Sequence, residues 1–277
     1  MWDPLSVTLS WLDEIDMVPD ASPLVMGIRA LGDRAWLIVD GDFDADLAEK
    51  MRLCRDRHGD VFGGDARSRE AGQAVVDLVR AEDRRVIDDP LLHPLDRAGR
   101  SIQEDLCLMH RRANGWCLAA ASLCFPSRWR LQDKMDRHIT QVHRPVDGYD
   151  SKLAKRVDGL FERLSEQPVW RRNWFVHPDP ALFQPDRPAN GDPVIPAAQA
   201  ADGLFVRSER QTLRVLPGLD DWILFTIRVQ QATVAEMVHD PARRAALQSY
   251  LSLAPSATLT HRGMAEPQVT ELQRLLR

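Results

Sequence analysis

The chain has 277 residues, of which 44% are hydrophobic and 28% are charged, and its formal net charge at pH 7 is -5. This length and composition are those of a soluble globular protein with a substantial core. The acidic balance excludes nucleic acid as the main partner, because binding to a phosphate backbone needs clustered and uncompensated Lys and Arg.

Membrane insertion and export are not expected either. The sequence has no run of about 18 apolar residues, the length that a membrane span needs. Its first residues carry acids where a signal peptide would carry a basic start. We therefore expect a cytoplasmic protein that does not enter a membrane.

The four cysteines are Cys54, Cys107, Cys117 and Cys124. None of them forms a CxxC pair, so their spacing predicts neither a zinc site nor an iron–sulfur site. We interpret them as buried or half-buried free thiols of a reducing compartment.

The first part of the chain is expected to supply one strand and three helices. The first 30 residues are a lead-in interrupted by prolines, and the apolar run 35–39 reads as a strand. Apolar residues at helical spacing then predict helices over 44–59, 68–85 and 100–112. We expect all three to pack on the outside of a sheet.

The middle of the chain alternates strands with connecting segments. Residues 116–125 are too apolar for a surface helix and predict a buried strand. A helix is expected over 151–166 and a strand over 169–175. Between 177 and 203 six prolines predict a long loop, and such loops are usually lids, binding loops or mobile inserts.

Two extended runs, 204–216 and 222–230, are joined by the turn sequence PGLDD and predict a hairpin. Alternation along the first run places Glu209 and Gln211 on the same inner face as Leu213. An ionised carboxylate is costly to bury without a cation or hydrogen-bond donors. Glu209 is therefore expected either to pair with Arg207 or Arg210, or to face a ligand. The chain then ends in helices, one of them capped by Asp240 and one over 267–277.

The stretch 125–149 concentrates groups that can do chemistry. His138 and His143 lie within it, and Pro145 after His143 prevents the backbone from continuing as a helix. The spacing of the two histidines does not match a helical zinc pair, and a lone histidine is most often structural. No GxGxxG, GxxxxGK[ST] or GxSxG motif is present. The sequence therefore does not favour a dinucleotide-binding fold, a P-loop or the nucleophile elbow of an α/β-hydrolase.

Several strings, taken together and in order over about residues 25–235, resemble one family. They are QEDLCLM (103–109), GWCLAAASLCFPSRW (115–129), HRPVDGY (143–149), RRNW (171–174), RSERQTLRVLP (207–217) and ILFTIRV (223–229). The chain resembles the haem subunit of the haem-dependent oxidative N-demethylases. It departs from that pattern at Asp147, where the family usually has a second proline.

The resemblance implies an α+β fold with a PAS-like antiparallel sheet flanked by helices. It implies a single domain over 1–277, made of a haem-binding core (25–235) with the proline-rich loop 177–203, and C-terminal helices (236–277). It also implies a haem b that is bound by His143, with His138 as the nearest rival for the iron. Arg128 and Arg210 are the candidates for binding the haem propionates.

The implied activity is a monooxygenase-type removal of a methyl group, as formaldehyde, from a small secondary amine such as dimethylamine. The reaction uses O₂ and electrons from separate FMN and iron–sulfur components, and tetrahydrofolate is an open candidate for collecting the formaldehyde. Glu209 is the candidate for holding the ammonium and taking its proton, and Gln211 or Tyr149 would orient it.

Two other classes stay open at this point. One is a haem-binding PAS-like sensor or carrier without turnover, and the other is a haem-free interaction domain in which His143 is a turn residue. A Soret band excludes the second of these, and formaldehyde release separates the enzyme from the sensor.

Overall fold

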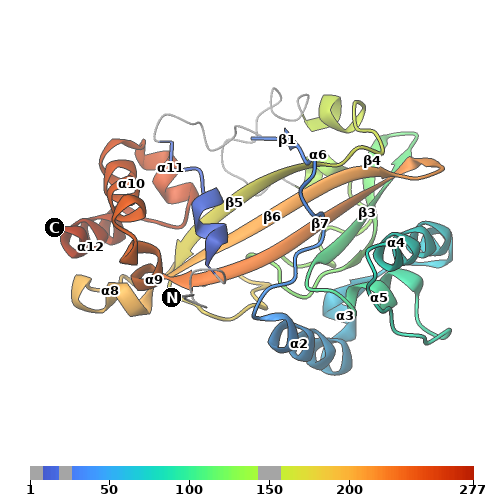
Figure 1. Cartoon of the computed structure of the whole chain (residues 1–277), viewed down its shortest axis with the longest axis horizontal. Coiled ribbons are helices and arrows are strands. Elements are labelled where there is room, and N and C mark those ends of the chain that lie inside the picture. Colours follow the sequence, from blue (N-terminus) through green and yellow to red (C-terminus); the bar gives the residue numbers. More distant parts are fainter. Residues whose placement is uncertain (1–8, 19–26, 143–156) are drawn as a thin grey trace.

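The computed structural model describes residues 9–18, 27–142 and 157–277 (Figure 1). The named strands form one seven-stranded sheet in the order β1-β5-β6-β7-β3-β4-β2, and each neighbouring pair is antiparallel. Helices flank this sheet, which confirms the predicted α+β class. The strands are β1 (Arg29–Ala30), β2 (Phe62–Gly63), β3 (Asp105–Arg112), β4 (Gly115–Ser122), β5 (Val169–His177), β6 (Phe205–Leu216) and β7 (Leu219–Thr233).

Helices lie both before and after β3 in the chain. Before β3 come η1 (Ser10–Glu14), α2 (Phe43–Asp56), α3 (His58–Val61), η2 (Ala66–Ser68), α4 (Arg69–Ala81) and α5 (Pro94–Gly99). After β3 come α6 (Ile139–Val142), α8 (Ala197–Gly203), α9 (Val234–His239), α10 (Pro241–Leu253), α11 (Ser256–His261) and α12 (Glu266–Leu276), and residues 157–161 are also helical. None of the helices in the described ranges is long and apolar enough to cross a membrane.

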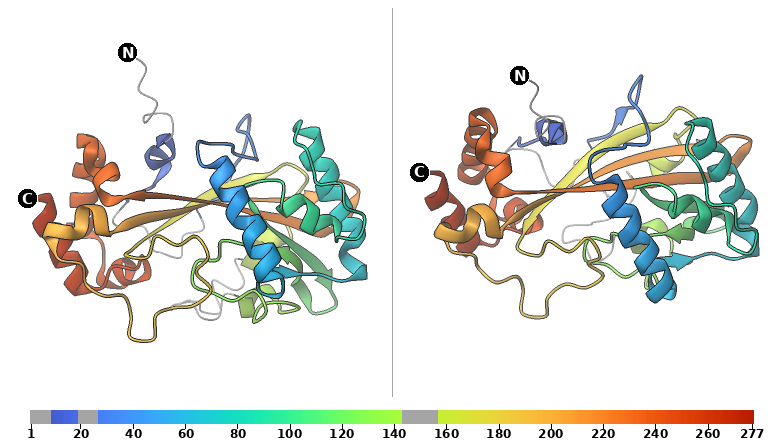
Figure 2. Two further views of the ribbon diagram at one scale, coloured as in Figure 1. Left: turned by 90° about the horizontal axis from the view of Figure 1, so that it is seen from below. Right: turned by 60° about the horizontal axis from the view of Figure 1, so that its bottom comes forward.

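Strands β6 and β7 run the length of the molecule, from the C-terminal helices at one end to their own turn at the other (Figure 2). The predicted hairpin is confirmed, with Pro217 and Gly218 between the strands and Gly218 at φ 72°. The predicted strands at 116–125 and 169–175 are confirmed as β4 and β5. The sheet thus unites the three segments that the sequence assigned to it.

The predicted helix over 100–112 is wrong. Residues 105–112 form β3, which pairs with both β4 and β7, and the preceding helix α5 ends at Gly99. Side chains of β3 are apolar on both faces, with Leu106 and Leu108 on one and Cys107 and Met109 on the other. A strand that is buried on both faces can mimic helical spacing, so periodicity alone did not separate the two.

The predicted strand over 35–39 is also wrong, because these residues form bends and irregular backbone. Trp36 and Leu37 are buried, as an apolar run requires. Their backbone is satisfied by side chains instead of by a sheet: Arg210 donates to the carbonyl oxygens of Ala35 and Trp36, and Ile38 N–H donates to Glu104. This pairing depends on residues far along the chain and leaves no local signal.

Predicted helices are confirmed over much of their length elsewhere. The segments 44–59 and 68–85 contain α2 and α4, and Asp240 caps α10 by accepting a hydrogen bond from Arg243 N–H. The described part of the segment 151–166 is helical over 157–161 and then turns, so this helix ends earlier than expected. The loop 177–203 contains one helix, α8.

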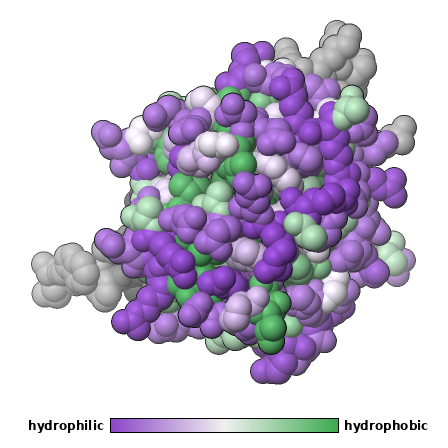
Figure 3. All heavy atoms as spheres, turned by 90° about the vertical axis from the view of Figure 1, so that its right-hand side faces the viewer, coloured by the Kyte–Doolittle hydropathy of each residue, from purple (hydrophilic) through white to green (hydrophobic). Residues whose placement is uncertain are grey.

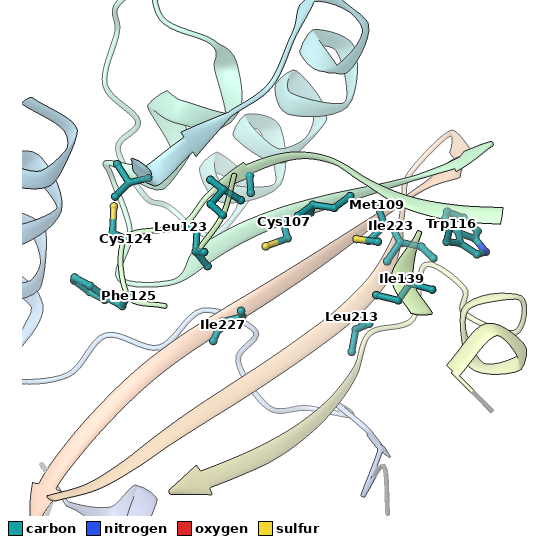
Figure 4. Packing of buried hydrophobic residues seen from close by; sticks show 14 of the residues in the cluster. Cys107, Met109, Trp116, Leu123, Cys124, Phe125, Ile139, Leu213, Ile223 and Ile227 are labelled. Atoms are coloured by element: carbon teal, nitrogen blue, oxygen red, sulfur yellow. The ribbon is translucent and has the colours of Figure 1, made fainter. Parts of the chain in front are cut away.

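The buried apolar residues of the described ranges form three clusters. One packs α4 and α5 against one face of the sheet, a second joins the far ends of β5, β6 and β7 to the C-terminal helices, and a third covers the opposite sheet face. Figure 4 shows this third cluster, with Leu213, Ile223 and Ile227 from β6 and β7 and with Phe125 at its end. The end of the molecule shown in Figure 3 is mainly hydrophilic, and apolar atoms reach it only in small separate groups.

Candidate functional site around Glu209

Glu209 lies in the middle of β6, opposite Asn173 of β5 and Val229 of β7. It is only 7% exposed and lies on the face of Leu213 and Val215, since β6 keeps its alternation up to an irregularity after Val215. The predicted burial and parity of Glu209 are confirmed. The hydrogen-bond donors and charges around this carboxylate then determine whether it can bind a further ligand.

Ser127 supplies the first donor to this carboxylate. Its hydroxyl Oγ lies 2.5 Å from Glu209 Oε1 and 2.9 Å from Arg207 Nε. A guanidinium only donates hydrogen bonds, so Ser127 Oγ must accept from Arg207. The single hydroxyl proton of Ser127 is then directed at Glu209, which accepts it.

Gln211 supplies the second donor, and here too an arginine fixes the orientation of the neutral group. Arg171 Nε donates to Gln211 Oε1 at 2.6 Å, and this fixes which end of the amide carries the oxygen. Gln211 Nε2 therefore faces Glu209 Oε2, at 2.8 Å, as a donor. Each carboxylate oxygen of Glu209 thus accepts one hydrogen bond from a neutral group, and each neutral group is oriented by an arginine.

Arg207 is fully buried and ties three chain segments together. It donates to the carbonyl oxygens of Phe125 at 2.9 Å and Leu182 at 3.0 Å, with longer contacts to those of Pro126 and Ala181. Burial lowers the pKa of Arg207 to about 10, and the nearby charge of Glu209 limits this shift. The side chain is therefore still a cation at neutral pH.

No ion pair within the described part of the chain reaches the Glu209 carboxylate. The sequence had predicted Arg207 or Arg210 as its direct partner if the role of Glu209 was structural. Arg207 acts through Ser127, and Arg210 lies on the other face of the sheet. A carboxylate that is held by two neutral donors keeps unused lone pairs for a further N–H donor.

On the opposite face of the sheet, buried arginines and carboxylates pair with each other directly. Arg172, Arg210 and Arg228 stand in register across β5, β6 and β7. Arg228 contacts Asp40 at 2.8 Å, and Arg172 contacts Glu14 at 2.7 Å. Those arginines pair directly with carboxylates or carbonyl oxygens, which contrasts with the indirect arrangement around Glu209.

The structure brings some of the predicted site residues together and separates others. Gln211 contacts Glu209, whereas Arg210 faces away and donates to the carbonyl oxygens of Ala35 and Trp36. Arg128 follows Ser127 and makes a bidentate pair with Asp192, at 2.6 Å for both contacts. His143 and Tyr149 lie outside the described residues.

Sequence reasoning missed Ser127, Arg171 and His177 as parts of this region. Arg171 and His177 share the face of Glu209 because β5 pairs with β6 in the register Arg171 to Gln211 and His177 to Phe205. Period-two alternation along β5 could have selected them. Ser127 had no such signal, because it follows β4 in irregular backbone.

His177 is an imidazole that is almost completely buried, and its Nδ1 has no hydrogen-bond partner among the described residues. Burial lowers its pKa to about 4, and the charges of Arg128 and Arg207 add to the effect. It is therefore neutral at pH 7. A neutral imidazole next to guanidinium groups is the type of donor set that suits a haem, whose iron takes imidazole and whose propionates take arginine.

His138, the predicted rival for the iron, precedes Ile139, which belongs to the apolar cluster on this face. It packs so closely against Gly115 that a Cβ there would collide with its ring, and its Nε2 lies 4.0 Å from Asp158 Oδ1. Within the described ranges no group of three or more His, Cys, Asp and Glu is placed to hold a bare metal ion. On the Glu209 face, the neutral imidazole of His177 and the guanidinium of Arg128 are groups of the kind that a haem iron and its propionates take as partners.

The buried neutral state of His177 predicts a pH effect on stability. Its folded pKa of about 4 lies below the unfolded value of 6.5, so the unfolded chain binds the extra proton between these values. Stability from this source is complete above pH 6.5 and falls as the pH drops toward 4, by about 2 kcal/mol between pH 7 and pH 5. Urea unfolding at both pH values should show a loss that is larger in the wild type than in His177→Leu by about this amount. An equal loss in both proteins would contradict the assignment.

Fold and site together define an α+β protein with a buried carboxylate that is held by neutral donors on one face of an antiparallel sheet. A sequence model of one family, described as haem-dependent oxidative N-demethylase, alpha subunit-like, matches residues 82–268. The chain belongs to that family. Strands β3 to β7 and the described residues of the Glu209 site lie inside the matched range. No curated protein matches the chain in sequence.

Proposed function

We propose that the protein is a haem-dependent oxidoreductase that removes a methyl group from a small secondary amine such as dimethylamine. Dimethylamine, O₂, two electrons and two protons would give methylamine, formaldehyde and water. The family name supports haem dependence and N-demethylation. The single structural observation that carries the proposal is the buried Glu209 carboxylate, which accepts from Ser127 and Gln211 and pairs with no cation in the described ranges.

Glu209 would bind the ammonium form of the amine. The N–H groups of such a ligand match the lone pairs that Ser127 and Gln211 leave unused. The carboxylate would then take the ammonium proton, so that the nitrogen lone pair becomes available before the methyl group is oxidised. Gln211 holds the carboxylate in place, and Tyr149 is proposed to help orient the amine.

We propose His143 as the axial ligand of a haem b, with His138 as the rival. Haem, when bound, supplies the activation of O₂ with externally delivered electrons. Arg128 is the better of the two predicted propionate partners, because it follows Ser127 whereas Arg210 faces the other side of the sheet. Leu213, Ile223 and Ile227 belong to an apolar cluster on this face that would help to keep water out.

Other proteins would deliver the electrons. The family is named for an alpha subunit, and we propose that separate FMN and iron–sulfur components act as the reductase. Tetrahydrofolate stays an open candidate for the acceptor of formaldehyde. The protein is proposed to work in the cytoplasm.

The axial ligand is tested by replacing His143, His138 and His177 by Ala, one at a time, in the full chain. We expect His143→Ala to lose haem and its Soret band, because a neutral imidazole ligand holds the iron, and we expect the other two variants to keep both. Haem lost from His138→Ala or His177→Ala and kept in His143→Ala would reassign the ligand. Wild-type protein that takes up no haem on reconstitution would contradict the haem proposal.

A further inference from the structure

Two arms of hydrogen bonds converge on Glu209, and each ends in an arginine. The Ser127 arm ends in Arg207, which is completely buried and donates to the hydroxyl of Ser127 and to four backbone carbonyl oxygens. The Gln211 arm ends in Arg171, which donates to Gln211 Oε1 at 2.6 Å. Through Ser127 and Arg207 the carboxylate is therefore tied to the backbone of two loops.

The contacts of Arg207 also explain why Ser127 is held where it is. The carbonyl oxygens of Phe125 and Pro126 precede Ser127 in the chain, and those of Ala181 and Leu182 belong to the proline-rich loop. A backbone bridge between Ser127 and Gln184 joins the same two segments. Ser127 thus sits on a clamped piece of backbone, although it lies in a loop.

The hydroxyl of Ser127 has no freedom to turn its proton elsewhere. Its oxygen accepts from Arg207 at 2.9 Å, and any rotation that moved the proton toward Arg207 would place two donors face to face. The proton therefore stays directed at Glu209 Oε1. A hydrogen-bond donor that is already oriented toward a charged group stabilises that charge more than a donor that must first reorient.

We propose that Ser127, fixed by Arg207, is a positioning residue that orients the Glu209 carboxylate toward the bound amine. This role rests on the proposed function of Glu209 as the ammonium-binding group. Ser127 acts through Glu209 and does not itself contact the substrate. Removing its hydroxyl should therefore change the state of Glu209 and, only through it, the binding of the amine.

The direct readout is the infrared carboxylate band of Glu209, isolated as the difference between the wild type and Glu209→Gln in the full chain. We expect this band to move in Ser127→Ala, because one hydrogen bond to the carboxylate is lost, and to stay at its wild-type position in Ser127→Thr, which keeps the hydroxyl. Ser127→Cys has a weak donor and should give an intermediate shift if the alanine variant does not fold. A band that does not move in Ser127→Ala or Ser127→Cys would overturn the proposal.

The second readout is the affinity of the haem-loaded protein for dimethylammonium. Ser127→Ala should weaken binding by about 10-fold, the usual effect of one hydrogen bond to a charged group, and Ser127→Thr should restore it. Added to Glu209→Gln, the Ser127→Ala change should cause no further loss. Losses that multiply in the double variant would show that Ser127 acts independently and would overturn the positioning role.

The two readouts separate the inference from the function on which it rests. A Glu209 band that moves in Ser127→Ala, together with unchanged dimethylammonium affinity in Glu209→Gln, supports the structural link from Ser127 to Glu209. The same result would contradict ammonium binding by Glu209.

Discussion

Replacing Arg207 by Met should destabilise the protein by about 4 kcal/mol or more, the largest stability effect expected of any single substitution in this region. The side chain is completely buried and donates to Ser127 and to four backbone carbonyl oxygens from two loops. Methionine fills much of the volume but donates nothing. Five acceptors would then lose a donor in a region with little water, and each buried unsatisfied group costs about 1–3 kcal/mol before the structure relaxes.

Equilibrium unfolding in urea measures this effect. Arg130→Met is the matched control, because Arg130 also makes short bonds, to Asp186, but both side chains are exposed. Exposed pairs contribute little, so this variant should unfold near the wild-type urea concentration. Equal midpoints for Arg207→Met and Arg130→Met would show that the buried contacts of Arg207 do not hold the two loops.

The elements that the sequence predicted well are those with a local signal. The β6–β7 hairpin has a proline–glycine turn between two long alternating runs, and alternation alone placed Glu209 on the face of Leu213. Helices such as α4 and α10 combine spacing with end signals. In these segments local preference and the final packing agree.

The elements that it predicted wrongly depend on distant partners. Strand β3 is apolar on both faces because β4 and β7 flank it, so it lacks the alternation that marks a half-buried strand. Residues 35–39 are apolar enough for a strand, but Arg210 satisfies their carbonyl groups from about 175 positions away. Neither fact can be read from a short window of sequence.

The site was predicted in part for the same reason. Alternation along the strand selected Glu209 and Gln211, but no local pattern indicates that Ser127 meets Glu209, because that contact spans 82 positions. Of the two alternatives left open for Glu209, direct pairing with Arg207 or Arg210 is not found, because Arg207 is held by carbonyl oxygens beside Ser127 and Arg210 points to the opposite face.

Replacing Glu209 by Gln should lower the kcat/KM for dimethylamine by about 10²–10⁴-fold, the range typical of a lost proton-transfer group. The amide is nearly isosteric with the carboxylate, but it cannot hold an ammonium ion by charge or take its proton. Ser127 and Gln211 would still be present, and the fold should be kept. Haem content should also be unchanged, because none of the proposed haem contacts is removed.

The measurement that tests the account most directly is formaldehyde release from dimethylamine by the haem-loaded full chain, with an external reductant and O₂. The wild type should release formaldehyde, and Glu209→Gln with equal haem content should release it at least 100-fold more slowly at low amine concentration. Formaldehyde release at the wild-type rate by Glu209→Gln would contradict the role of this carboxylate. A wild-type protein that carries haem and releases no formaldehyde would be a sensor or carrier and not an enzyme.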